Sequence, residues 1–338
     1  MLGLAQAGFS RIATATLAGV LMLSLSGCLV VRGARMIESH NATQGFPAKG
    51  DTDTAQTRTI VAGGQQRRYL VQVPSGGSSA MPIVVVLHGG TQTAEQAWEQ
   101  TSLPTLGLLD HFIVAAPQGV GKHWNDGRGS TLAGDEASSA DDVGFIRSLI
   151  AELVLRDRGD ARAVFIIGAS NGGFMAMYYA CQAGDTLRAG SNVISDLPAA
   201  VARGCKSGKA LPWLSMNGVK DPVVPFKGMA EGTVVKGQPQ AALLSADATF
   251  QFWAQRAGCS ANAQVTRIAE GVEKRVRLCA NGLSSQQYVF ANGGHVWPGL
   301  PVNSPGLAYF LGGANLEVDT GDVAWGFFKS TLATSTSR

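Results

Sequence analysis

Uninterrupted apolar runs alternate with helical patterns along most of the chain. Ile83–Leu87, Phe112–Ala116 and Val164–Ile167 contain no charged residue, which is typical of strands buried on both faces. Apolar residues at helical spacing predict helices at Ala94–Glu99, Val143–Leu155, Gly172–Gln182, Ala248–Ala257 and Val323–Leu332. Buried strands that alternate with helices predict an α/β fold, with a mostly parallel central sheet and helices on both faces.

The regular pattern begins with a hairpin and continues almost to the C-terminus. Thr59–Ala62 and Arg68–Val73 alternate in polarity, and Gly63-Gly64 supplies the turn between them. Later strands are predicted at Asn192–Ile194, Trp213–Met216, Val265–Ile268, Arg275–Leu278 and Gln287–Phe290. We therefore predict one domain over residues 57–334, and a polar tether without periodicity over residues 28–56.

The first 27 residues have the pattern of a secretory signal peptide. Arg11 precedes the apolar stretch Ile12–Leu25, and small residues lead to Cys28. This junction resembles the lipobox of bacterial lipoproteins, in which the cysteine is lipidated and becomes the first mature residue. A transmembrane anchor is the alternative, but the apolar run is short for a full span. We expect an exported protein of the cell envelope, periplasmic or at the cell surface, which a lipid on Cys28 tethers to a membrane.

The remaining cysteines fit an oxidising compartment. They are Cys181, Cys205, Cys259 and Cys279. An even number in an exported chain predicts two disulfides with three possible connectivities, of which we favour the local pairs Cys181–Cys205 and Cys259–Cys279. Buried free thiols are the alternative. No CxxC spacing occurs, so we expect no metal site.

Composition and charge exclude few functions. The chain is 45% hydrophobic and 15% charged, as expected for a globular protein with a substantial core. Its formal net charge is only +3, and lysine and arginine form no long run. Nucleic acid is therefore not an expected partner.

Gly168-Ala169-Ser170-Asn171-Gly172 fits the G-x-S-x-G pattern of a nucleophile elbow. The pentapeptide alone is a weak signal, and a glycine-rich turn without chemistry is its alternative. Its context is more specific, because a buried strand precedes it and a helical pattern follows. In such a turn the serine takes a strained backbone conformation that flanking glycines tolerate, and its hydroxyl lies at the positive end of the helix. Ser170 is the predicted nucleophile.

A serine nucleophile needs a base, and His295 is the best placed of the five histidines. It follows the late strand Gln287–Phe290, where an α/β sheet places its working residues. His40 lies in the tether and His111 at the start of a strand. His123 lies in a long loop and His88 in a glycine-rich loop. His88 is expected to form structural hydrogen bonds.

The acid of a serine triad should lie between the nucleophile and the base in chain order. Asp221 follows the strand Trp213–Met216 and is our preferred candidate, which would orient the imidazole and stabilise its charged form. Asp196, after the weaker strand Asn192–Ile194, is the rival. A turn aspartate that caps its own backbone before Pro222 is the structural alternative for Asp221.

Two backbone N–H groups are candidates for an oxyanion hole. His88-Gly89-Gly90-Thr91 follows the strand Ile83–Leu87, and glycine there lets an N–H turn inward. The second donor would be the N–H of Asn171, directly after the nucleophile. Gly90 and Asn171 are therefore the predicted pair.

Five strings together resemble the polyhydroxybutyrate depolymerase and feruloyl (acetylxylan) esterase family of α/β-hydrolases. In chain order they are Leu87–Ala94, Trp124–Arg128, Asp141–Ile146, the Ser170 elbow and Gly294–Gly299, and the similarity runs from about residue 58 to the end. The resemblance implies a Ser170–Asp221–His295 triad that cleaves carboxylic esters through an acyl-enzyme, without metal or cofactor. One departure is Gly90, where depolymerases often have cysteine, so the oxyanion contact would differ slightly.

The resemblance implies an ester substrate of feruloyl or acetyl carbohydrate type, or a short hydroxyalkanoate ester. A polyhydroxybutyrate oligomer depolymerase is the alternative, and we see no appended polymer-binding domain, which favours soluble esters or oligomers. Alternatives from other classes are a non-catalytic surface-binding lipoprotein and a peptidase on the same fold. Trp124 and Trp297 either line the substrate pocket or pack beneath its loops. Asp141 is expected to cap the helix that follows it.

Overall fold

The structure is a computed structural model that describes residues 46–76, 79–129, 139–206, 208–235, 238–302 and 305–333. The predicted signal peptide, Cys28 and the first part of the predicted tether lie outside the described residues. The other elements of the sequence prediction can be compared with the structure directly.

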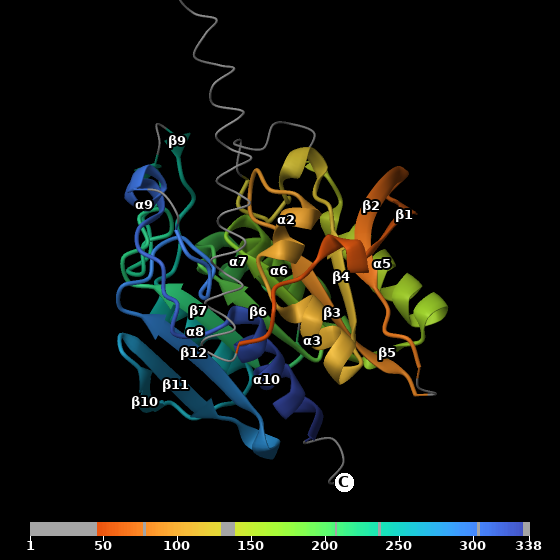
Figure 1. Cartoon of the computed structure of the whole chain (residues 1–338). Helices are drawn as coiled ribbons and strands as arrows, with labels where there is room; N and C mark the ends of the chain where they lie inside the picture. The colour runs from red at the N-terminus through yellow and green to blue at the C-terminus, as the bar shows by residue number, and fades with distance from the viewer. Residues whose placement is uncertain are drawn as a thin grey trace, which may run out of the picture.

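One large sheet organises the described part of the chain (Figure 1). Its ten strands are β1 (Gln56–Ala62), β2 (Gln65–Gln72), β3 (Met81–Leu87), β4 (Ile113–Pro117), β5 (Gly159–Ala169), β6 (Ala189–Val193), β7 (Trp213–Gly218), β10 (Gln264–Ala269), β11 (Val272–Leu278) and β12 (Ser284–Phe290). The order is β1-β2-β4-β3-β5-β6-β7-β12-β11-β10. Strands β4 to β12 in this order are parallel, and an antiparallel hairpin closes each edge. The predicted mostly parallel sheet is confirmed.

Helices cover both faces of this sheet (Figure 1). They are α2 (Ala94–Glu99), α3 (Leu103–Asp110), α5 (Asp142–Asp157), α6 (Asn171–Ala183), α7 (Ala199–Arg203), α8 (Ala246–Arg256), α9 (Pro305–Leu311) and α10 (Thr320–Ala333). One core packs α5, α6 and α8 on the sheet, and the other packs α2, α3 and α10 on its opposite face. None of the helices in the described residues has the length and apolarity needed to cross a membrane.

The central strands supply both cores because their side chains alternate between the two faces. In β3, Ile83 and Val85 belong to the core with α5 and α6, whereas Val84 and Val86 belong to the core with α2 and α10. All four are essentially fully buried. A strand buried on both faces can be apolar at every position, which explains the uninterrupted run in the sequence.

Helix α3 was not predicted, because Pro104 and Gly107 interrupt its pattern. The structure explains the glycine: a Cβ at Gly107 would lie 2.9 Å from the carbonyl oxygen of Phe112 and 2.9 Å from the side chain of Val114. The helix therefore approaches β4 too closely for any larger residue at this position.

The second half of the predicted tether, residues 28–56, contacts the domain. Residues 46–55 pack on the domain, where Lys49 forms a buried ion pair with Asp319 at the start of α10. The Gly50 N–H donates to a backbone carbonyl between α2 and α3 at 2.8 Å. Contacts of this kind produce no hydrophobic periodicity, so the sequence pattern could not reveal them. Residues 46–55 of the predicted tether therefore contact the domain.

Both favoured disulfides are confirmed. Cys181 of α6 pairs with Cys205, which follows α7, and Cys259 pairs with Cys279 at the end of β11. The first disulfide holds the C-terminal half of the elbow helix, and the second joins the end of α8 to the sheet edge.

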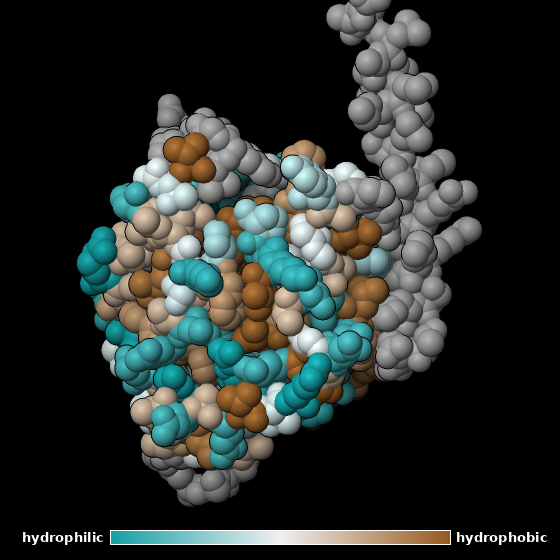
Figure 2. Space-filling view, turned by 90° about the vertical axis from the view of Figure 1, so that its left-hand side faces the viewer, coloured by the Kyte–Doolittle hydropathy of each residue, from teal (hydrophilic) through white to brown (hydrophobic). Residues whose placement is uncertain are grey.

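Figure 2 shows the side of the molecule that carries α9, the short hairpin β8 (Val234–Val235) and β9 (Gln238–Pro239), and the edge strands. Apolar and polar residues are interspersed across this face. Exposed apolar side chains on these elements are Val234, Val265, Ile268, Leu278, Tyr309 and Phe310. The edge strand β10 is exposed along most of its length and carries Arg267 among its apolar residues, which is how natural sheets keep an open edge from pairing with another chain.

Candidate active site

Ser170 lies in a sharp turn between β5 and α6. Its backbone angles are φ 52° and ψ −120°, which a non-glycine residue adopts only when its surroundings hold it there. Its N–H donates to the carbonyl of Val193 at 3.0 Å, and its own carbonyl accepts from Phe174 at 2.9 Å. These bonds hold the turn between the neighbouring strand and the first turn of the helix.

The two glycines of the elbow allow this turn to close. A Cβ at Gly168 would lie 2.2 Å from the carbonyl oxygen of Gly172, and a Cβ at Gly172 would lie 2.4 Å from that of Leu87. Both distances are far below van der Waals contact. The glycines are therefore required by the close approach of α6 to β5 and to the end of β3.

His295 joins Ser170 to Asp221 through both of its ring nitrogens. The Nε2 atom lies 2.9 Å from Ser170 Oγ, and the Nδ1 atom lies 2.8 Å from Asp221 Oδ2. With the carboxylate on Nδ1, the proton resides there and Nε2 presents a lone pair to the serine hydroxyl. The structure therefore brings together the three side chains predicted as nucleophile, base and acid.

The loop of Asp221 is held independently of the histidine. Its Oδ1 atom accepts from the N–H groups of Val223 and Val224, both at 2.8 Å, which leaves Oδ2 for His295. The Lys220 N–H also donates to the Gly293 carbonyl at 2.9 Å, so the acid loop rests on the histidine loop. The turn capping proposed as an alternative role for Asp221 is present alongside its bond to His295, on the other carboxylate oxygen.

The rival Asp196 does not reach the histidine. It is fully buried, and its Oδ1 atom accepts from Asn217 Nδ2 at 3.0 Å. Among the described residues, Asp221 is the carboxylate bonded to His295.

Gly90 and Asn171 lie next to each other at the mouth of the elbow. A Cβ at Gly90 would be 3.5 Å from the Asn171 Cβ and 3.4 Å from the ring of His123. Within the described part of the chain, the Gly90 N–H has no acceptor. Asn171 is the first residue of α6, so its N–H has no acceptor within the helix. The two predicted oxyanion donors are thus close together and available to a ligand.

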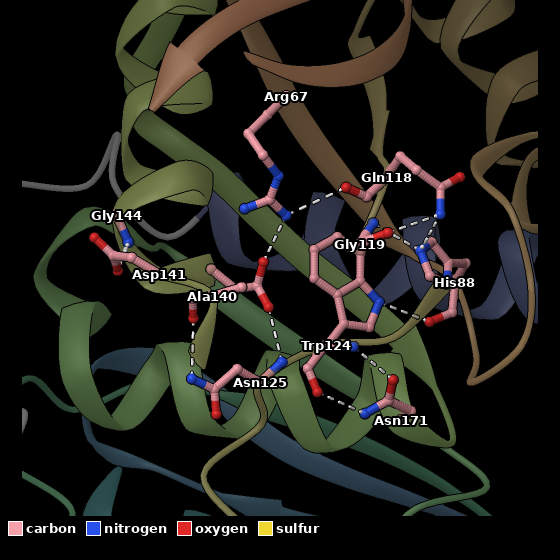
Figure 3. A network of polar contacts seen from close by, with 11 residues as sticks. Arg67, His88, Gln118, Gly119, Trp124, Asn125, Ala140, Asp141, Gly144 and Asn171 are labelled. Atoms are coloured by element: carbon pink, nitrogen blue, oxygen red, sulfur yellow. Dashed lines mark hydrogen bonds and ion pairs between the residues drawn. The ribbon is translucent and has the colours of Figure 1, made fainter. Parts of the chain in front are cut away.

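The side chain of Asn171 is bonded to the backbone of Trp124 (Figure 3): its Oδ1 accepts from the Trp124 N–H at 2.8 Å, and its Nδ2 donates to the Trp124 carbonyl. The Nδ2 atom also donates to Asp126 Oδ2 at 2.6 Å. Arg128 in turn holds Asp126 through a two-pronged ion pair and lies over the ring of Phe174. The first residue of α6 is therefore anchored by the loop of residues 124–128.

His88 is a structural hydrogen-bonding residue, as its sequence position predicted. Its Nδ1 donates to the Gly89 carbonyl at 2.8 Å, and its Nε2 accepts from the Gly119 N–H at 2.9 Å and from Gln118 at 3.1 Å. The indole of Trp124 donates to the His88 carbonyl at 2.9 Å (Figure 3). These bonds tie the glycine-rich loop of Gly90 to the loop that holds Asn171, which places the two oxyanion donors relative to one another.

A buried ion pair completes this support. Arg67 of β2 lies 2.6 Å from Asp142 Oδ1, and Asp142 Oδ2 accepts from the Asn125 N–H at 2.7 Å (Figure 3). Asp141 caps α5 by accepting from Gly144, as predicted. The role of Arg67 was missed, although its place in the inward-facing series with Tyr69 and Val71 was a readable signal of a buried charge.

The His88 network predicts acid sensitivity of the fold. Burial lowers the pKa of His88 from 6.5 to about 4. Because the unfolded chain takes up this proton near pH 6.5, the folded state loses stability as the pH falls from about 6.5 to 4, by up to about 3 kcal/mol. Urea unfolding of the wild type and of His88→Gln, whose amide cannot titrate, measures this loss. We expect the stability advantage of the wild type to shrink between pH 7.5 and pH 4.5. An advantage that stays constant over this range would contradict the role of His88.

A pocket of about 320 Å³ opens directly above the triad. Its floor contains Ser170 and His295, and one wall is the Gly90 loop. The rest of the lining is Gln92, Gln100, Ile194, Val296, Trp297, Leu300, Pro301, Val302 and Leu311, with Gly89, Thr91 and Ala169. The lining is mostly apolar, with two glutamines on one side.

The two tryptophans have different places. Trp297 lines the pocket, whereas Trp124 is 2% exposed and lies beneath the loops, between His88 and Asn171. Of the two roles predicted for Trp124, lining the pocket or packing beneath its loops, the structure shows the second. Its indole N–H donates to the His88 carbonyl. In the described part of the chain, no group of three or more histidine, cysteine or acidic side chains could hold a metal ion.

Comparison with known proteins places this arrangement among esterases. No family model matches the chain. Over 238 residues it is 30% identical to feruloyl esterase B of Piromyces equi, a match that covers 68% of this chain and 42% of that protein. It is 26% identical over 305 residues to the putative esterase NocK of Nocardia uniformis subsp. tsuyamanensis, covering 86% of this chain and 87% of that protein. The chain is therefore related to feruloyl esterases and other carboxylic ester hydrolases.

A solved structure agrees on the fold of this α/β-hydrolase. An acetyl xylan esterase from Aspergillus awamori superposes with a TM-score of 0.55 at 16% sequence identity, covering 81% of this chain and 99% of that one. The chain spans less than half the length of the Piromyces relative. The predicted α/β-hydrolase fold is confirmed.

The pocket lining is the part of this α/β-hydrolase site that sequence reasoning identified least well. The sequence predicts that the loops near Thr91–Gln100, Gly119–Ala140 and Pro301–Leu316 shape the pocket. The first and the third line it, whereas no described residue of Gly119–Ala140 does. Ile194 was missed as a lining residue; it directly follows β6 and has a φ of 44°. Its position directly after a parallel strand could have identified it, because the loops at the carboxyl ends of parallel strands converge on the ligand site.

Proposed function

We propose that this chain is a serine carboxylic ester hydrolase that works through an acyl-enzyme intermediate. The observation that carries the proposal is the hydrogen-bonded series from Ser170 through His295 to Asp221, on the floor of a pocket beside two free N–H donors. The similarity to feruloyl esterase B and to a putative esterase supports ester hydrolysis as the chemistry.

In the acylation step, Ser170 Oγ attacks the ester carbonyl carbon and His295 Nε2 takes the hydroxyl proton. Asp221 keeps the imidazole in the required tautomer and stabilises the imidazolium. The carbonyl oxygen becomes an oxyanion, which the N–H groups of Gly90 and Asn171 stabilise. The intermediate then collapses, and His295 gives its proton to the departing alcohol.

In the deacylation step, water attacks the acyl-enzyme with His295 again as the base. The tetrahedral intermediate uses the same two N–H donors, and its collapse releases the acid and returns the proton to Ser170. Because one base serves both half-reactions, its position between Ser170 and Asp221 must be maintained throughout the cycle.

The proposed substrates are esters with a feruloyl or acetyl acyl group on a carbohydrate, or short hydroxyalkanoate esters. Ile194, Trp297 and Leu300 give the pocket apolar surface that suits an aromatic or short aliphatic acyl group. Gln92 and Gln100 add polar groups that could orient hydroxyl substituents of the substrate. A polyhydroxybutyrate oligomer depolymerase is the alternative within the same chemistry.

A substrate panel tests this proposal. We expect the purified protein to hydrolyse methyl ferulate, acetylated xylan or hydroxybutyrate oligomers, with a kcat/KM for the preferred ester at least about 100-fold above that for its matched amide. The amide series serves as the control for a peptidase on the same fold. Equal or faster amide cleavage, or no ester cleavage by folded protein, would contradict an ester hydrolase.

We also propose that the protein is exported and anchored to a cell-envelope membrane through a lipid on Cys28. Two disulfides support an oxidising compartment. Fatty-acid labelling and membrane fractionation of the wild type and of Cys28→Ala test the anchor. Labelling that is unchanged in the variant would exclude Cys28 as the lipidated residue.

A further inference from the structure

A buried carboxyl group that the mechanism does not use lies beside the acid of the triad. Asp196 follows β6 and is 0% exposed, and Asn217 near the end of β7 is 3% exposed. Asn217 precedes Asp221 by four residues in the same strand-to-loop segment. Asn217, the partner of Asp196, therefore lies on the segment that leads to the catalytic acid.

The hydrogen bonds between Asp196 and Asn217 leave two acceptor atoms of this pair unpaired. Asn217 Nδ2 donates to Asp196 Oδ1 at 3.0 Å and to the Ser195 carbonyl at 3.2 Å. Within the described residues, Asp196 Oδ2 and Asn217 Oδ1 have no partner, although both are buried. Buried polar atoms are nearly always hydrogen-bonded, so two unpaired acceptors on residues already in contact need an explanation.

The surroundings of Asp196 disfavour a negative charge. The charged groups that act on it are Asp221, from the loop after β7, and Asp247, from the first turn of α8, and both are acidic. In the described part of the chain, no salt bridge reaches Asp196. Burial, and then the charge of Asp221, raises the pKa of Asp196 well above its usual range.

We propose that Asp196 is a positioning residue for the triad acid and that it acts as a neutral carboxylic acid paired with Asn217. One proton on Asp196 Oδ2 donates to Asn217 Oδ1, which satisfies both unpaired atoms at once. Together with the existing bond from Asn217 Nδ2, it closes a ring of two hydrogen bonds. The ring joins the loop after β6 to β7, the strand that leads to Asp221.

The neutral state also matters for the charge of the triad. An ionised Asp196 would place a second negative charge near Asp221 and would strengthen the hold of the site on the His295 proton. The protonated form keeps the two hydrogen bonds between the loop after β6 and β7 without adding this charge. The inference rests on the proposed role of Asp221, but its main tests do not require ester hydrolysis.

The first test uses stability against pH. Asparagine has the shape and hydrogen-bond pattern of the protonated acid, so Asp196→Asn keeps the ring and cannot ionise. The folded wild type holds a proton that the unfolded chain releases near pH 4, so its folding equilibrium constant falls about tenfold per pH unit relative to the variant. Urea unfolding between pH 5.5 and pH 7.5, without substrate, measures this ratio. A ratio that does not change with pH would show an ionised Asp196 and overturn the proposal.

The second test uses turnover. Asp196→Leu removes both hydrogen bonds and keeps the branched outline of the side chain, and we expect kcat to fall about tenfold with little change in KM, because Asp221 loses part of its support. Asp196→Asn should rescue kcat to near the wild-type value. A loss in Asp196→Asn as large as that in Asp196→Leu would mean that the charge is needed, and would overturn the proposal.

A third measurement needs no variant that might fail to fold. Infrared spectra of the wild-type protein with carboxyl-labelled aspartate should show the band of a protonated carboxylic acid at neutral pH. Absence of this band from folded protein would overturn the proposal. Neither this spectrum nor the unfolding series depends on an ester substrate. Both would therefore still test the protonation of Asp196 if the protein proved not to be an esterase.

Discussion

Replacement of Ser170 by alanine is expected to lower kcat for an ester substrate by at least about 10⁴-fold, with KM within a few-fold of the wild type. The Ser170 hydroxyl oxygen is the atom that forms the acyl-enzyme, and it lies 2.9 Å from His295 Nε2. Alanine leaves no nucleophilic atom at this position. The oxyanion donors and the pocket remain, so binding should persist. Initial rates with a p-nitrophenyl ester measure the loss.

The Ser170→Ala variant should fold as the wild type does, because alanine tolerates a φ of 52° about as poorly as serine. Its unfolding midpoint is therefore the control that separates lost chemistry from lost structure. Turnover within about tenfold of the wild type, in protein of normal stability, would be incompatible with Ser170 as the nucleophile.

Replacement of Asp221 by asparagine is expected to lower kcat about 10⁴-fold, the scale seen when the acid of a serine triad becomes an amide. Asparagine can still accept the N–H groups of Val223 and Val224 through its Oδ1 atom. Its Nδ2 atom, however, would donate to His295 Nδ1 and move the imidazole proton to Nε2. The histidine would then face Ser170 with a proton and could not take another.

Asp196→Asn is the matched control for this variant, because it makes the same chemical change in the neighbouring carboxyl group. Titration of kcat against pH in both variants would distinguish their roles: we expect a large loss at every pH for Asp221→Asn and none near neutral pH for Asp196→Asn. If the two losses were reversed, Asp196 would be the acid of the triad and the assignment of Asp221 would be wrong.

Local rules explain why the elbow and the order of the triad could be read from the sequence. The strand before Ser170, its flanking glycines and the helix after it lie within a few residues of each other. Asp221 and His295 each follow a recognisable strand, and parallel strands bring their carboxyl ends to one edge of the sheet. Their contact therefore follows from strand order and topology, without knowledge of any loop conformation.

The support behind the oxyanion hole could not be read in this way. Trp124 contacts His88 and Asn171, which lie 36 and 47 residues away in the chain. These contacts depend on the conformation of the loop after β4, which carries no periodicity and contains a glycine, Gly121, with a φ of 56°. The same limit explains why residues 46–55 were placed in the tether, since backbone hydrogen bonds and one buried ion pair leave no pattern of polarity.

The sequence alone does not decide whether Asp196 or Asp221 is the acid of the triad. Both follow a strand and both lie between Ser170 and His295 in chain order. The difference is the direction of each side chain: Asp221 Oδ2 meets the imidazole, whereas Asp196 turns into the core against Asn217. Side-chain direction in a loop is set by tertiary packing, and only the structure contains it.

Covalent trapping of the acyl group shows whether Ser170 is the nucleophile. The protein is mixed with a slowly released ester or a fluorophosphonate, quenched in acid, digested and mapped by mass spectrometry. We expect one adduct per molecule, on the peptide that contains Ser170, and no adduct in Ser170→Ala. An adduct on another residue, or continued ester turnover by a protein that carries no adduct on Ser170, would contradict it.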